Sequence, residues 1–105
     1  GIVEQASEQE LADASALVDK TGTFNCPHTG VALAAFLKLK ERGVFKKSDR
    51  VVIVSTAHGL KFVEFKIGYH MGQLEGVFSK YANRPVELPP DYDAITETIF
   101  KSIEK

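Results

Sequence analysis

Apolar residues recur at helical spacing in the first part of this chain. Ser7 and Glu10 stand at the spacing of a helix capping box, and an apolar stripe follows them. The stripe is made up of Leu11, Ala14, Leu17 and Val18. The pattern predicts a short strand or extended segment at residues 2–5, and then a helix of about a dozen residues that ends near Thr21-Gly22.

Three further segments have helical spacing. One helix is predicted to begin at Thr29 and to end at Gly43, a suitable residue for a helix C-cap. Aromatic residues at positions 62, 65 and 69 favour a short helix over residues 62–70. Asp91 or Asp93 is placed to cap a last helix, in which isoleucine stands at positions 95, 99 and 103. Residues 72–90 lack periodicity and are expected to be extended.

The clearest strand signal is the run Val51-Val52-Ile53-Val54. Because polar residues do not alternate with apolar ones in this run, it is typical of a parallel strand buried on both faces. Such a strand needs neighbours, and residues 23–25 offer only one brief extended segment. We therefore expect an α/β fold, with a partial parallel sheet flanked by helices. Residues 1–105 then form a single segment of a larger domain, and a start at Gly1 fits an excised piece.

Composition and charge exclude several classes of function. The chain has 13 basic and 14 acidic residues and a formal net charge of −1, so it lacks the basic patch expected for binding nucleic acid or an anionic membrane surface. No apolar run is long enough to cross a bilayer. The single cysteine, Cys26, cannot form an internal disulfide, which fits a reducing compartment. We expect a cytoplasmic protein, or a plastid protein if an upstream transit segment has been removed.

Polar residues follow the predicted strand directly. Ser55, Thr56 and His58 lie there, and Gly59 comes next. Ligands of open α/β sheets bind beyond the carboxyl ends of the strands, so these side chains are the first candidates for contacting a ligand. A neutral hydroxyl at this place can hydrogen-bond a heteroaromatic nitrogen without requiring that nitrogen to be protonated. The alternative is that the two hydroxyls only end the strand and His58 begins a turn.

A second polar group, Cys26-Pro27-His28-Thr29-Gly30, precedes the second predicted helix. The free amides of a helix N-terminus favour anions, and His28 and Thr29 could add side-chain donors. The alternative is that Thr29 only caps the helix and that Gly30 allows close packing. Metal binding is not expected, because the cysteine and the three histidines match no common ligand spacing. Lys61 and Cys26 are likewise not expected to act as nucleophiles.

Taken together, these motifs resemble the carboxyl-terminal portion of the threonine synthase family. The resemblance rests on TGTFNCPHTGVAL at residues 21–33, on VVIVSTAHGLKF at 51–62 and on NRPVELPPDYDAI at 83–95. It covers essentially the whole chain. It implies a pyridoxal-phosphate lyase with the tryptophan-synthase β-like fold, also called fold type II. Such an enzyme converts O-phosphohomoserine and water to threonine and phosphate in threonine biosynthesis.

The resemblance also implies roles for individual residues. Thr56, with Ser55 as the second choice, would hydrogen-bond the pyridine nitrogen of the cofactor, and His28 and Thr29 would line the substrate pocket. The family's Schiff-base lysine and glycine-rich phosphate loop have no counterpart here, since Lys61 matches a different family lysine. We therefore expect no catalytic residue in this segment, which would need the remainder of the enzyme as its partner and would be inactive alone. A homodimer is compatible with this arrangement.

A hypothesis from a different class is a free-standing α/β interaction or ligand-binding module without catalysis. Such a module would use the open edge of its sheet to pair with a partner.

Overall fold

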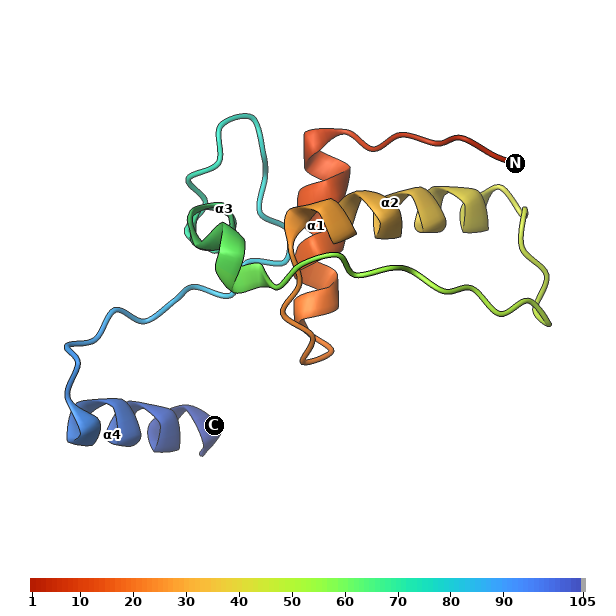
Figure 1. Cartoon of the computed structure of the whole chain (residues 1–105). Coiled ribbons are helices and arrows are strands. Elements are labelled where there is room, and N and C mark those ends of the chain that lie inside the picture. The colour runs from red at the N-terminus through yellow and green to blue at the C-terminus, as the bar shows by residue number, and fades with distance from the viewer. Residues whose placement is uncertain (105) are drawn as a thin grey trace.

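The computed structural model describes residues 1–104 and contains helices without a sheet (Figure 1). The elements in chain order are α1 (Glu8–Asp19), α2 (Pro27–Glu41), the 3₁₀ helix η1 (Gly59–Phe62), α3 (Val63–His70) and α4 (Tyr92–Ile103). The only β-type pairing within residues 1–104 is an isolated antiparallel bridge between Asn25 and His58.

The expected α/β fold with a partial parallel sheet is therefore wrong for this structure. Residues 51–54 are extended but lie beside no second strand, and Val52 and Val54 are 86% and 70% exposed. Residues 2–5 do not form a strand either. The physical reason is that a strand satisfies its backbone groups only through a neighbour, whereas a helix satisfies them internally. The other strongly apolar segments of residues 1–104 have formed helices, which leaves residues 51–54 without a partner.

Helix α1 begins as its sequence predicts. The Ser7 hydroxyl accepts a hydrogen bond from the Glu10 amide at 3.2 Å, and the Glu10 carboxylate accepts one from the Ser7 amide at 2.8 Å. This reciprocal pair satisfies two amides that the helix itself leaves free. Helix α2 begins two residues before the predicted start at Thr29, because Pro27 occupies its first turn and Cys26 is the N-cap residue.

Helices α1 and α2 cross in close contact, and small residues line their interface (Figure 1). The buried positions are Ala12, Ala14, Ser15 and Ala16 of α1 and Thr29, Gly30 and Ala34 of α2. A Cβ atom on Gly30 would lie 2.5 Å from the carbonyl oxygen of Leu11, so only glycine permits this approach. The buried face is thus centred on the alanines rather than on the larger residues of the predicted stripe.

Tyr69 of α3 joins this pair to the following loop. Its ring packs on Ala12 and Ala16 in the core, and its hydroxyl donates to the Asp13 carboxylate at 2.6 Å. The same oxygen accepts from the Tyr81 amide at 3.1 Å. Burial, together with the hydrogen bond to the Asp13 carboxylate, raises the pKa of Tyr69 to about 12.

The loop after α3 is also attached to α1 through Gln9. The Gln9 amide nitrogen donates to the Phe78 carbonyl at 2.8 Å, and its amide oxygen accepts from the Phe78 amide at 2.8 Å. One side chain therefore satisfies both backbone groups of a loop residue, as a neighbouring strand would do.

Helix α4 lies apart from the other helices (Figure 1). The Asp91 carboxylate accepts a hydrogen bond from the Ala94 amide at 2.9 Å, which confirms one of the two predicted caps. None of its residues is buried. Its exposed large apolar side chains are Tyr92, Ile95, Ile99, Phe100 and Ile103.

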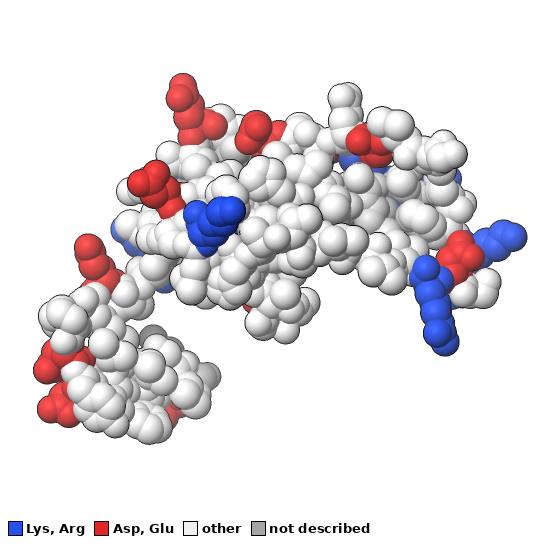
Figure 2. All heavy atoms as spheres, in the orientation of Figure 1, with Lys and Arg blue, Asp and Glu red and all other residues white. Residues whose placement is uncertain are grey.

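The charged side chains form no extended patch of one sign on the face that Figure 2 shows. This distribution agrees with the near-neutral net charge of −1. Among residues 1–104, no helix combines the length and the apolar character needed to cross a membrane.

Candidate functional site

Two sequence motifs that are about thirty residues apart meet at the bridge between Asn25 and His58. The Cys26 amide donates to the Ala57 carbonyl at 3.2 Å, and the Gly59 amide donates to the Phe24 carbonyl at 3.0 Å. These hydrogen bonds hold the residues before α2 against the residues that follow the Val51–Val54 run. The two groups of candidate residues are therefore neighbours.

At this junction a sulfur atom and three hydroxyls form a connected group. Cys26 Sγ lies 3.4 Å from Thr29 Oγ1 and 3.8 Å from Thr56 Oγ1. The Thr29 hydroxyl donates to Ser55 Oγ at 3.4 Å. Cys26 and Thr29 are buried, whereas Ser55 and Thr56 are exposed. We call these four residues the hydroxyl cluster, and its buried half supports its exposed half.

The environment of Cys26 acts on its thiol in two opposing ways. Burial raises the pKa of the Cys26 thiol, because it disfavours the charged thiolate. Hydrogen-bonding contacts with the Thr29 side chain and backbone and with the Thr56 and His28 side chains lower the pKa, and the net result is a pKa of about 6 for Cys26. The sulfur is thus in contact with the hydroxyls of Thr29 and Thr56, and in each contact either atom can be the donor.

The exposed half of the hydroxyl cluster faces a hollow of about 530 Å³. The lining residues are Gly22, Thr23, Phe24, Ser55, Thr56, Ala57 and His58. A pyridine ring nitrogen needs one hydrogen-bonding partner, and the neutral hydroxyls of Ser55 and Thr56 suit it. The lining contains no lysine for a covalent bond to a cofactor aldehyde and no arginine for a phosphate. The hollow therefore offers neutral hydroxyls to a ring nitrogen, and its lining contains neither a lysine nor an arginine side chain.

The histidines of the two motifs have local contacts. His58 is the N-cap of η1, and its Nδ1 accepts a hydrogen bond from the Leu60 amide at 3.1 Å. This arrangement agrees with the interpretation of His58 as the start of a turn. His28 is exposed in the first turn of α2, and its ring meets the edge of Phe62 with the ring centroids 5.0 Å apart. His28 does not line the hollow beside Thr56.

No group of three or more metal-ligating side chains occurs among residues 1–104. Lys61 of η1 is exposed.

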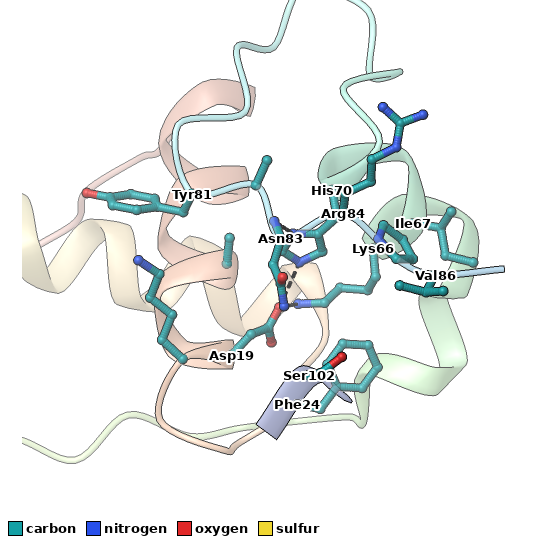
Figure 3. A pocket seen from close by; sticks show the side chains of 14 residues that line it. Asp19, Phe24, Lys66, Ile67, His70, Tyr81, Asn83, Arg84, Val86 and Ser102 are labelled. Carbon is teal, nitrogen blue, oxygen red and sulfur yellow. Dashed lines mark hydrogen bonds and ion pairs between the residues drawn. The ribbon is translucent and has the colours of Figure 1, made fainter. Parts of the chain in front are cut away.

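A larger hollow of about 680 Å³ lies between α1, α3 and the loop from Tyr81 to Val86, and Ser102 of α4 also lines it (Figure 3). At its base the ammonium group of Lys66 lies 2.5 Å from the Asp19 carboxylate and donates to the Ser15 hydroxyl at 2.9 Å. His70 Nε2 lies 3.5 Å from the same carboxylate. Lys66 is only 4% exposed, and its contacts account for its charge, so this ion pair has a structural role.

Sequence reasoning missed this ion pair. The signal was available in principle, because Lys66 precedes the buried Tyr69 by three residues and therefore shares its helix face. A lysine on a buried face requires an acidic partner, and Asp19 supplies it.

The comparisons with known proteins agree with the resemblance seen in the motifs. No protein-family model matches the chain. Threonine synthase 2, chloroplastic, from Arabidopsis thaliana is 50% identical over 99 residues, which are 94% of this chain and 19% of that protein. Threonine synthases from Methanocaldococcus jannaschii and from a Bacillus species are 34% and 39% identical over 62 residues, or 58% of this chain. Those matches cover 15% and 18% of the two relatives.

All three of these relatives are named threonine synthases. Over its matched residues the chain belongs to the threonine synthase family. It spans about a fifth or less of the length of the curated relatives that it matches.

Proposed function

We propose that this segment supplies one wall of the cofactor site to a complete threonine synthase, which converts O-phosphohomoserine and water to threonine and phosphate. When bound, pyridoxal phosphate supplies the electron sink for that chemistry. The observation that carries the proposal is the hydroxyl cluster, in which the exposed hydroxyls of Ser55 and Thr56 border a hollow. The 50% identity to the Arabidopsis enzyme supports it.

Thr56 is proposed to hydrogen-bond the ring nitrogen of the cofactor, with Ser55 as the second choice. A hydroxyl is neutral, so it can hold the nitrogen in place without fixing its protonation state as a carboxylate would. His28 and Thr29 are proposed to face the substrate side. For Thr29 this role is indirect, because its side chain is buried and its hydroxyl contacts Ser55.

We assign no catalytic residue to this segment. Lys66 is paired with Asp19, and the motif match gives Lys61 no covalent role. The lysine and the phosphate-binding loop are proposed to come from the remainder of the enzyme, so the isolated segment should be inactive. For the complete protein, the cytoplasm and the plastid are the two candidate locations. The plastid is a candidate because the Arabidopsis relative is named chloroplastic.

The test is a Thr56→Val substitution in the full-length enzyme. Valine keeps the shape of threonine and removes its hydroxyl. Turnover or cofactor affinity should therefore fall by about fivefold or more, as expected for the loss of one hydrogen bond, while the unfolding midpoint changes little. The matched control is Thr21→Val, because the Thr21 hydroxyl only donates to the Val18 carbonyl at the end of α1. Unchanged kinetics and affinity in Thr56→Val would refute the assignment.

The alternative hypothesis of a free-standing module predicts a different length for the native polypeptide. An immunoblot of the source tissue with an antibody against residues 1–104 should detect a product several times longer than this chain if the proposal is right. A native product of about this length would favour the module.

A further inference from the structure

The Thr56 side chain lies where no regular secondary structure restrains it. Residues 51–56 belong to no helix or strand, and Thr56 is exposed. Within residues 1–104, the single side-chain hydrogen bond of Thr56 is the 3.8 Å contact between its hydroxyl and Cys26 Sγ. The direction of the hydroxyl therefore depends on the sulfur atom.

Cys26, in contrast, is fixed from several sides. It is fully buried, and its amide donates to the Ala57 carbonyl at 3.2 Å. Its own carbonyl accepts from the Thr29 and Gly30 amides in the first turn of α2, at 3.1 and 3.4 Å. Its sulfur also contacts the Thr29 hydroxyl at 3.4 Å. Since both its backbone and its sulfur are held in place, Cys26 can restrain the side chain of Thr56, which has no other side-chain hydrogen bond among residues 1–104.

A hydroxyl can form one hydrogen bond as a donor and two as an acceptor. When the Thr56 hydroxyl accepts from the Cys26 thiol, its own O–H remains free to donate to an unprotonated ring nitrogen. When it donates to the sulfur, its lone pairs remain free to accept from a protonated ring nitrogen. In both cases the free position points away from Cys26. The hollow lies on the exposed side of Thr56. We propose that Cys26 is a positioning residue, whose sulfur holds the Thr56 hydroxyl in the direction of the cofactor ring nitrogen. This inference rests on the proposed function of Thr56 and adds to it a residue that does not touch the cofactor.

The experiment uses the full-length enzyme with the variants Cys26→Ala, Cys26→Ser, Thr56→Val and the double variant Cys26→Ala/Thr56→Val. Two properties are measured: the dissociation constant for pyridoxal phosphate, and the ¹⁵N chemical shift of the ring nitrogen after reconstitution with ¹⁵N-labelled cofactor. Both report on the contact with Thr56 independently of turnover. Ser15→Ala is the matched control. It also removes one buried heteroatom, but the Ser15 hydroxyl contacts Lys66 and not the hydroxyl cluster.

We expect Cys26→Ala to weaken cofactor binding by about threefold to fivefold and to move the ¹⁵N shift in the same direction as Thr56→Val. Cys26→Ser retains a hydrogen-bonding atom and should recover part of both effects. In the Thr56→Val background, Cys26→Ala should have no further effect, because a positioning residue acts only through the group that it positions. Ser15→Ala should leave the ¹⁵N shift unchanged.

The result that would overturn the inference is an effect of Cys26→Ala that is equally large with threonine or valine at position 56, since such an effect would be structural. A Cys26→Ala variant with unaltered binding and ¹⁵N shift would also overturn it, and would leave the role of Thr56 intact if Thr56→Val has its effect. If Cys26→Ala does not fold, the effect of Cys26→Ser is compared with threonine and with valine at position 56, and the inference is judged on that comparison. A Thr56→Val enzyme with unaltered properties refutes the proposed function itself.

Discussion

The paired helices α1 and α2 differ from helix α4 in which of their residues are buried. The buried residues of α1 and α2 are small: alanines, a serine, a threonine and a glycine. Helix α4 has a clear apolar face with isoleucines four residues apart, yet it buries none of them. The amphipathic pattern thus specifies that a helix forms and which face is apolar. It does not specify what covers that face.

The extended residues 51–54 resemble α4 in this respect. Their valines are largely exposed, although their sequence is as apolar as a protein core. The packed region and these exposed segments should therefore respond very differently to the same type of substitution, and four predictions test this difference.

The largest expected effect is in the packed region, at Lys66. Lys66→Met removes the ammonium group that lies 2.5 Å from Asp19 and leaves a carboxylate that is itself mostly buried. The free energy of unfolding should fall by about 4 kcal/mol, the typical cost of leaving a buried charge without its partner. The matched control is Lys101→Met in α4, because the pair between Lys101 and Glu97 is exposed and should matter by less than about 0.5 kcal/mol. Similar losses in a urea titration of both variants would remove the distinction between the two regions.

A smaller loss is expected at the contact between α1 and α2. Gly30→Ala places a methyl group 2.5 Å from the Leu11 carbonyl oxygen, so the helices must separate. Overpacking of this kind costs about 2 kcal/mol. Gly1→Ala adds the same methyl group where no atom lies within 4 Å, and chemical denaturation should detect no change there. A Gly30→Ala variant as stable as the parent would mean that the two helices pack less closely than described.

Tyr69→Phe should have an intermediate effect, because it removes the hydrogen bonds to Asp13 and from Tyr81. We expect a loss of about 1.5 kcal/mol in the free energy of unfolding, against almost none for Tyr92→Phe on the exposed face of α4.

The raised pKa of Tyr69 also makes the free energy of unfolding depend on pH. Because the pKa of Tyr69 rises to about 12 on folding from 10.0, its contribution is complete below pH 10 and is lost as the pH approaches 12. Phenolate absorbance during an alkaline titration should show one tyrosine that ionises late, and its absence would contradict this environment.

The smallest effect is expected on the apolar face of α4. Ile99→Ser changes a side chain that is 51% exposed, so the stability of this chain should change by less than about 0.5 kcal/mol. The comparison variant Ala34→Ser lies in the buried face of α2 and should cost more than about 1 kcal/mol, because it buries a hydroxyl without a prepared partner. Thermal unfolding of both variants measures the difference, and a greater loss from Ile99→Ser would show that α4 is packed.

Local signals in the sequence predicted the helices well. The capping box of α1 and the Asp91 cap of α4 depend on residues within one helical turn, so the sequence contains all the required information. The aromatic spacing at residues 62–70 predicted the region of α3, although its first turn is the 3₁₀ helix η1. The predicted strand failed because pairing depends on residues distant in sequence, and nothing in the run Val51-Val52-Ile53-Val54 identifies a partner.

In the candidate site, too, the features that depend on neighbouring residues were predicted, and the contacts between distant residues were not. The sequence identified both polar motifs, including Ser55 and Thr56, from their position after an apolar run. It gave no sign that Cys26 would link them, because that link depends on the bridge between Asn25 and His58. The spacing of Lys66 and Tyr69 places the lysine on a buried helix face, but it does not identify the partner, because Asp19 belongs to a different helix.

The two hydrogen bonds between Gln9 and Phe78 have a consequence for the tolerance of the loop to change. They join residues 69 positions apart and use only the main chain of Phe78, a residue that is 77% exposed. Many side chains could therefore replace this phenylalanine without loss of the attachment, whereas proline could not, because it has no amide hydrogen. The attachment of the loop thus depends on the side chain of Gln9 and on the main chain, not the side chain, of residue 78.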